Sequence, residues 1–384
     1  MVGGIGVGQI IAWGSSYYLI AVLADPIARA TGWSLPWVVG GASPGFLVSG
    51  LISPRIGRLI EAQGGRPALA GSAVLLAAGL ALMAAAPSLV VYYAAWAIIG
   101  AGMGAGLYDP AFATLGRLYG AQARGAITQV TLFGGFASTV CWPLTALLQA
   151  HLGWRGACLG LAAILLGVVL PIYLLVLPKQ AGPAAPRSPS AAAEAPKLPH
   201  RRLALGLVAA SLTIASVVMT MVAVHLLTLL RDRGIGLAEA VALGALIGPA
   251  QVGARLIEMF AGRIGHPVWT MLVSTVTVAL GLALLLADAQ AAAAAIVLYG
   301  AGSGIRSIVR GTVPLALFGQ HGYATLMGRL AMPSLVAQAA VPALGGLLIA
   351  RVGEHATLLL LVGAAVLNIA PAALLLPLAR RRPP

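Results

Sequence analysis

Residues 88–110 read SLVVYYAAWAIIGAGMGAGLYDP and carry no charged side chain before Asp109. A run of about 20 apolar residues is long enough to cross the hydrocarbon core of a bilayer as a helix. Residues 290–315 read QAAAAAIVLYGAGSGIRSIVRGTVPL, so Gly100-Ala101-Gly102-Met103-Gly104 matches Gly300-Ala301-Gly302-Ser303-Gly304 at an offset of 200. The two stretches predict transmembrane helices at equivalent places in a duplicated membrane protein.

The composition of the whole chain supports a membrane protein. Of the 384 residues, 60% are hydrophobic and 8% are charged, and the mean hydropathy is +0.97. A soluble domain usually carries roughly a quarter charged residues, because its surface must be hydrated. The net charge of +14 would suit nucleic acid, but the basic residues lie in gaps between apolar runs, as the positive-inside rule describes. We therefore expect no nucleic-acid partner.

The apolar segments predict an all-α membrane protein with twelve transmembrane helices. The segments are 3–24, 35–54, 67–86, 88–110, 125–149, 156–177, 203–229, 237–256, 268–287, 290–315, 326–349 and 356–378. The long polar interruption at 178–202 is rich in Pro, Ala and Ser, which is typical of a flexible linker. It divides the chain into an N-terminal six-helix bundle, 1–177, and a C-terminal six-helix bundle, 203–384.

The distribution of Lys and Arg predicts the orientation. Loops on one side of the predicted membrane hold fifteen basic residues, with Arg255 counted among them, and loops on the other side hold five. Both termini and the linker are therefore expected to be cytoplasmic, in a bacterial-type inner membrane. The first apolar segment has no basic region before it, so we expect a retained helix rather than a signal peptide, preceded in the native protein by a short basic tail.

A second match between the halves supports the duplication. Arg58-Leu59-Ile60-Glu61, after the second predicted helix, recurs as Arg255-Leu256-Ile257-Glu258 after the eighth, at an offset of 197. A duplicated six-helix unit is the architecture of many secondary transporters, which bind the solute between the two halves.

Residues 57–66, GRLIEAQGGR, resemble the loop signature G-x-L-x-D-R-x-G-R-R of the Major Facilitator Superfamily. Glu61 stands in place of the usual Asp, and Ala62 replaces the first Arg. With the linker and the two sets of six helices, the resemblance covers nearly the whole chain. It implies a pair of pseudo-symmetric bundles that carry a solute by alternating access.

Shorter patterns are similar to the oxalate/formate and monocarboxylate carriers of that superfamily. They are Thr31-Gly32-Trp33-Ser34, the Gly-rich segment that ends near Tyr108, Leu152-Gly153-Trp154-Arg155, and His225. This similarity implies a small, carboxylate-like anion as the solute. Two motifs of proton-driven drug exporters are absent, an Arg early in helix four and a Gly-Pro motif in helix five, which disfavours a proton/drug antiporter.

The predicted solute site centres on two arginines. Arg306 and Arg310 lie one turn apart in helix ten, and guanidinium groups bind carboxylates with paired hydrogen bonds. A charge in hydrocarbon is costly without a partner or a wet cavity, and the alternative is snorkelling toward the headgroups. The other candidate substrate-binding residues are Trp13, Tyr17, Tyr18, His225 and Gln251. The alternative roles are aromatic packing for Trp13, Tyr17 and Tyr18, an interfacial position for His225 and interhelical hydrogen bonding for Gln251.

Charged residues near the cytoplasmic ends predict gates or coupling groups. These candidates are Asp109, Arg310, Glu61, Glu258, Arg255 and Arg329. We expect Glu61 to accept hydrogen bonds at the start of helix eleven, and Glu258 to do the same for helix five by pseudo-symmetry, because a carboxylate is stabilised at a helix N-terminus.

The sequence predicts neither an enzyme nor a cofactor. Nothing in it resembles a phosphate loop, a zinc site or a nucleophile triad. The expected partners are the solute, membrane lipid and a coupling proton or counter-transported anion, and the expected oligomeric state is a monomer. Efflux of toxic or drug-like compounds, including arsenicals that Cys141 and Cys158 would bind, is the alternative function. A membrane-embedded enzyme is a more remote alternative.

A charge-swap experiment tests the predicted gate. The offset of 200 pairs Pro110 with Arg310, so Asp109 and Arg310 are expected at nearly equal depth, where a salt bridge would form in one state and break in the other. Asp109→Arg and Arg310→Asp should each impair transport in proteoliposomes, and the double swap should recover part of it. Two normally inserted single variants with no recovery in the double would count against the gate.

Overall fold

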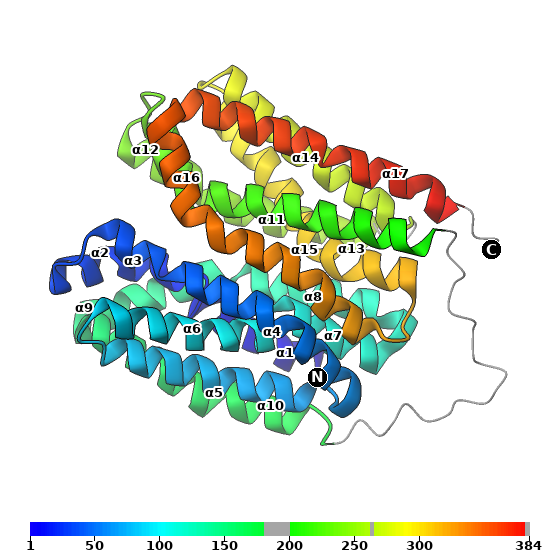
Figure 1. Ribbon diagram of the computed structural model, residues 1–384, viewed down its shortest axis with the longest axis horizontal. Helices are drawn as coiled ribbons and strands as arrows, with labels where there is room; N and C mark the ends of the chain where they lie inside the picture. The colour runs from blue at the N-terminus through cyan, green and yellow to red at the C-terminus, as the bar shows by residue number, and fades with distance from the viewer. Residues whose placement is uncertain (180–199, 262–264, 381–384) are drawn as a thin grey trace. The chain divides into compact units, whose positions relative to one another are not determined.

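The computed structural model describes residues 1–179, 200–261 and 265–380, and every regular element in these ranges is helical (Figure 1). The elements are α1 (Val2–Gly14), α2 (Leu19–Thr31), α3 (Leu35–Gly40), α4 (Ala42–Gln63), α5 (Gly65–Ala84), α6 (Leu89–Gly106), α7 (Tyr108–Tyr119), the 3-10 turn η1 (Gly120–Gln122), α8 (Ala123–Gly135), α9 (Ala137–Ile164), the π-helical η2 (Leu165–Val169), α10 (Leu170–Val176), α11 (Arg201–Arg231), α12 (Leu237–Ala245), α13 (Ile247–Ala261), α14 (Pro267–Ala287), α15 (Ala292–Phe318), α16 (Tyr323–Leu367) and α17 (Ile369–Arg380).

These helices supply twelve membrane crossings in the described residues. Ten segments are long and apolar enough to span a bilayer, and two of them, Ala123–Val176 and Tyr323–Ala379, have 54 and 57 residues. Each of these two is long enough for a pair of crossings of about 20 residues. Each is broken by a glycine with non-helical geometry, Gly153 (φ 69°, ψ 175°) and Gly353 (φ 81°, ψ 171°). The predicted fold class, an all-α protein of twelve transmembrane helices, is confirmed.

The contacts group the chain into two units. The first contains Met1–Ala195 and Gln320–Ala339, and the second contains Pro196–Gly319 and Ala340–Pro384. The predicted division into 1–177, 178–202 and 203–384 stays a prediction, and most of the predicted linker, 180–199, lies outside the described residues.

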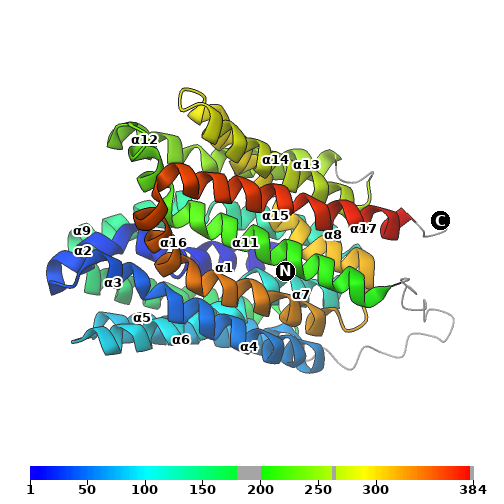
Figure 2. The same ribbon diagram turned by 45° about the horizontal axis from the view of Figure 1, so that its top comes forward.

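Glycine contacts hold the first unit together. Helix α6 packs against α4 and runs beside α5 in both views (Figure 1, Figure 2). A Cβ added to Gly100 would lie 2.1 Å from the carbonyl oxygen of Gly45, and one added to Gly102 would lie 2.7 Å from Leu76. The glycines of helix four therefore form a close-packing face, because no larger residue leaves the backbones room to meet.

The second unit repeats this packing with α15 on α13 and α14. Gly79 packs on Ile99 in the first unit, and Gly281 packs on Tyr299 in the second. Gly79 of helix three thus corresponds to Gly281 of helix nine, at an offset of 202 residues. Ile99 of helix four corresponds to Tyr299 of helix ten, at an offset of 200 residues.

This packing register corrects the match at an offset of 197. Gly104 contacts the carbonyl of Ser49, and Gly304 contacts that of Gln251, again at an offset of 202 in the partner helix. Arg255 therefore corresponds to Ser53, not to Arg58, and Glu258 corresponds to Ile56, not to Glu61. Backbone contacts define the equivalence, whereas four identical letters arise easily by chance in so biased a composition.

Several predicted helix limits were wrong. The predicted helix 35–54 extends to Gln63, where Gly64 (φ 83°) ends it, so most of the loop signature is helical. The predicted helices 3–24 and 88–110 are each interrupted, at residues 15–18 and at Leu107. Apolar periodicity does not reveal these interruptions, because they depend on individual serine, proline and glutamine residues rather than on hydropathy.

Substituting a contact glycine should destabilise the first unit. Gly100→Ala should lower the free energy of unfolding by about 1–3 kcal/mol, since its Cβ meets backbone that no rotamer change can move. Gly71→Ala in α5 is the matched control, because nothing lies within 4 Å of its Cβ position, so it should be neutral or stabilising. Thermal unfolding in detergent measures both, and an equal effect of the two would contradict the packing argument.

Candidate functional site

Transmembrane helix one is interrupted at residues 15–18, between α1 and α2. The hydroxyls of Ser15 and Ser16 turn back and donate to the carbonyls of Ile11 (2.7 Å) and Ala12 (2.5 Å). Such back-bonding by serine bends helices, because it competes with the regular helical hydrogen bonds. The interruption leaves the following two tyrosines outside regular helix.

The aromatic side chains at this interruption form one continuous cluster. The ring centroid of Trp13 lies 5.3 Å from Tyr17, 6.2 Å from Tyr18 and 4.8 Å from Tyr108. Tyr17 also reaches Phe46, at 5.8 Å. These tilted and edge-on contacts are the favoured aromatic geometries. The structure thus brings the three predicted aromatic residues together and adds Tyr108 and Phe46, which the sequence analysis did not assign to the site.

Gln9 joins the cluster to a break in transmembrane helix four. Its side chain is fully buried, its Nε2 donates to the carbonyl of Gly106 at 2.6 Å, and its Oε1 accepts from Trp13 Nε1 at 3.2 Å. Pro110, four residues after Gly106, has no N–H to donate to that carbonyl. The helix is broken between these residues at Leu107 (φ −76°, ψ −160°).

The corresponding place in the second repeat is unbroken. Arg310 stands where Pro110 stands, and α15 runs without interruption from Ala292 to Phe318. Gln9 was not among the site residues predicted from the sequence. Two features of the sequence indicate this contact: the polar amide of Gln9 within the first apolar segment, and Pro110 within a run long enough to be one helix.

Arg306 occupies the middle of α15 and is half-buried. Its Nε lies 2.8 Å from the Sδ of Met219 in α11, and its Nη2 also donates to that sulfur. A thioether is a weak acceptor, so a carboxylate can replace it. By the packing register Arg306 corresponds to Gly106, at the break of helix four beside the aromatic cluster. Arg310 is half-buried one turn further along.

Arg255 is a buried residue of α13, with 4% of its surface exposed, and not the loop residue that the orientation count assumed. Its Nε donates to the carbonyl of Gly304 at 3.2 Å, and its Nη2 donates to Ser307 Oγ at 2.9 Å and to Gln251 Oε1 at 3.3 Å. Gln251 Nε2 in turn donates to Ser303 Oγ at 3.1 Å. This network joins α13 to α15, so the structure shows Gln251 in interhelical hydrogen bonding.

The side chain of Glu61, a residue of α4, contacts the start of α16, as the sequence predicts. Its Oε2 accepts from the backbone N–H of Ala324 at 3.1 Å, and both residues belong to the first unit. Helices α4 and α16 approach closely here: a Cβ added to Gly328 would lie 3.1 Å from the Cα of Gly57. The free N–H groups of the first turn favour a carboxylate at this place. The part of Glu61 in a gate stays a prediction.

The other two charged candidates have separate environments. Glu258 Oε1 accepts from Thr270 Oγ1 in α14 at 3.1 Å, and the packing register removes the basis for a symmetry relation with Glu61. Arg329 is exposed on α16. Their gating roles also stay predictions.

His225 is half-buried in α11 and packs against Gly345, where an added Cβ would lie 2.6 Å from its Nε2. That nitrogen is buried and has no hydrogen-bond partner within the described part of the chain. A role in proton or substrate binding stays a prediction.

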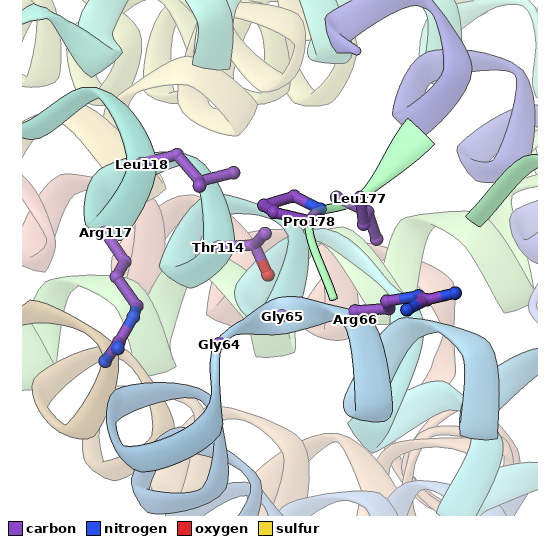
Figure 3. A pocket seen from close by; sticks show the side chains of 8 residues that line it. All are labelled: Gly64, Gly65, Arg66, Thr114, Arg117, Leu118, Leu177 and Pro178. Carbon is purple, nitrogen blue, oxygen red and sulfur yellow. The ribbon is translucent and has the colours of Figure 1, made fainter. Parts of the chain in front are cut away.

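Two small pockets lie in the first unit. Asp109 lines one, together with Pro110, Gly57 and Gly328. The other surrounds the start of α5, where Arg66 and Arg117 extend away from each other on opposite sides (Figure 3). Arg66 Nη2 donates to the carbonyl of Leu174 at 2.7 Å. In the described ranges no group of three His, Cys, Asp or Glu side chains is placed to hold a metal ion.

A duplicated set of transmembrane helices, with interrupted helices and an intramembrane arginine, is the architecture of many secondary transporters. The chain belongs to the Major Facilitator Superfamily, whose family model matches residues 5–265. It is a multi-pass membrane protein.

Three known proteins illustrate the similarity. The human monocarboxylate transporter 11 is 28% identical over 284 residues, which are 72% of this chain and 57% of that protein. The human organic anion transporter MFSD10 (TETRAN) has a TM-score of 0.73 at 17% identity, covering 97% of this chain and 98% of that one. The proton:xylose symporter XylE has a TM-score of 0.74 at 12% identity, covering 98% and 94%. The chain spans about half the length of the curated relatives it matches.

The Arg255 network should require a guanidinium. Arg255→Lys should lower the free energy of unfolding by about 1–3 kcal/mol, since an ammonium cannot reach the carbonyl, amide and hydroxyl together. The matched control, Arg351→Lys, changes an exposed arginine of the same unit and should be nearly neutral. Thermal unfolding in detergent compares the two, and a stable Arg255→Lys protein would refute the structural role.

Proposed function

We propose that this chain is a secondary active transporter that moves a small, carboxylate-like anion by alternating access. The proposed anion-binding group is Arg306 of the second repeat, and Trp13, Tyr17 and Tyr18 of the first repeat are proposed solute contacts. A coupling proton or a counter-transported anion is the second partner.

The observation that carries the proposal is the position of Arg306. A half-buried guanidinium in the middle of a transmembrane helix is costly unless it serves a partner or a hydrated cavity. Snorkelling would direct the group toward the headgroups, but Arg306 Nε and Nη2 are directed at the sulfur of Met219 within the unit. An anionic group of a solute offers that guanidinium a much stronger acceptor.

The interruptions of helices one and four support a site at the same level of the first repeat. Broken transmembrane helices are tolerated where the backbone lines a cavity or is satisfied by neighbouring protein groups, and transporters place solutes beside them. The aromatic rings at these breaks offer a wide apolar wall, with hydroxyl and indole groups that bind polar parts of a solute. His225 and Gln251 remain proposed contributors from the second repeat.

Two relatives support an anionic solute by their names, a monocarboxylate transporter and an organic anion transporter. A proton:xylose symporter has an equally similar fold, so the fold does not select the solute.

Efflux of toxic or drug-like compounds is the alternative function. Cys141 donates its Sγ proton to the carbonyl of Ile10, and Cys158 is fully buried, so neither thiol of α9 is placed to favour an arsenical. Uptake and counterflow in proteoliposomes with carboxylates, sugars, cations and arsenicals compare the classes directly.

The topology is part of the proposal. With the buried Arg255 left out, fourteen basic residues remain in the predicted loops on one side and five on the other, which still favours cytoplasmic termini in a bacterial-type inner membrane. We also propose a monomer, with Asp109, Arg310, Glu61, Glu258, Arg255 and Arg329 as the candidate gate and coupling residues.

Replacing the proposed anion-binding group should weaken solute binding. Arg306→Gln should raise KM for a transported carboxylate about tenfold or more, since hydrogen bonds to charged groups contribute about 1.5–3 kcal/mol. Arg306→Lys should retain part of the affinity, because it keeps the charge and loses the paired geometry.

The matched control is Arg231→Gln, which removes an exposed arginine at the end of α11. It should leave KM unchanged. If Arg306→Gln inserts normally and transports carboxylates with the KM of the unmodified protein, the proposed site is wrong.

A further inference from the structure

We infer that Gln9 is a positioning residue, which supports the break in transmembrane helix four and thereby sets the direction of Tyr108 in the solute site. The role in transport rests on the proposed function; the role in the break does not.

The first step concerns the carbonyl of Gly106. Position 110 would normally donate its N–H to this oxygen, and Pro110 has none. Gly106 is buried in a unit that spans a bilayer, where water does not replace a missing donor. Gln9 Nε2 supplies the donor at 2.6 Å, from a helix about a hundred residues earlier in the chain.

The second step concerns the other end of the same amide. Gln9 Oε1 accepts the indole proton of Trp13 at 3.2 Å, one turn further along α1. Both ends of the amide are therefore engaged, and reversing it would lose both hydrogen bonds. One fully buried side chain thus couples the backbone of helix four to the ring of Trp13.

The third step concerns Tyr108, the first residue of α7. The extended geometry of Leu107 (ψ −160°) sets the direction in which α7 and its first side chain leave α6. In that direction Tyr108 lies 4.8 Å from Trp13 and stacks on Phe112, at 5.1 Å and 11°. A continuous helix would rotate Tyr108 away from this position. Helix ten, with Arg310 at the equivalent position, needs no such device.

A double-mutant cycle on stability tests the first step without reference to any solute. Gln9→Leu should lower the thermal midpoint by several degrees, because the carbonyl of Gly106 becomes a buried acceptor without a donor. Pro110→Ala restores an N–H at the helical position. The same Gln9→Leu change should therefore cost much less when Pro110→Ala is already present.

Transport by the same proteins tests the positioning role. Pro110→Ala, which is expected to fold stably and to close the break, should raise KM for the transported solute several-fold, and the double variant should share this defect although its stability is recovered. A purely structural role for Gln9 would instead restore transport together with stability in the double variant.

Matched substitutions elsewhere provide the controls. Gln129→Leu changes an exposed glutamine of α8, and Pro143→Ala changes an exposed proline within α9. Neither should reproduce the coupling or the change in KM.

Two results would overturn the inference: an equal cost of Gln9→Leu in both backgrounds, or an unchanged KM in Pro110→Ala. The failure of the proposed function is a different result, in which Arg306→Gln leaves carboxylate transport intact or the panel shows another solute. The Gln9–Pro110 cycle can still be measured in that case, with KM taken for the solute that is carried.

Discussion

The constraint on which the rest of this structure depends is that a backbone polar group in the hydrocarbon core must find its partner inside the protein. Continuous helices meet it automatically, and most of the described chain is helical. At two of the places where the chain departs from the helix, side chains bond to the backbone carbonyls there. The amide of Gln9 does so at Gly106, opposite a proline, and serine hydroxyls contact the carbonyls before the interruption of helix one.

Close packing of helices follows from the absence of a hydrophobic driving force between them in lipid. Association then depends on backbone proximity and on internal hydrogen bonds, which explains why glycines line the contacts of α6 and α15. The same contacts define the internal repeat more securely than sequence identity does. They show that the two halves share a framework and differ locally. In the first repeat helices one and four are broken and carry an aromatic cluster, and in the second the equivalent α11 and α15 are continuous and α15 carries Arg306 and Arg310.

The charged residues of the second unit illustrate how one residue type serves two purposes. Arg255 has its guanidinium directed to a carbonyl and a hydroxyl of α15 and to an amide of its own helix, so it is built into the packing. Arg306 contacts a thioether, which is a weak acceptor. The strength of the acceptors around each guanidinium, rather than its burial alone, distinguishes a structural arginine from a candidate ligand-binding one.

The sequence by itself determined the membrane class, the number of crossings, the duplication and the contact of Glu61 with helix eleven, because hydropathy, helix length and a short signature are local properties of the chain. Only the tertiary structure decided the register between the repeats, the burial of Arg255 and the importance of Gln9. Each of these depends on which atoms meet across helices far apart in the chain. Gln9 and Gly106 are separated by 97 positions, and nothing in either local sequence states that a proline in one helix needs an amide from the other.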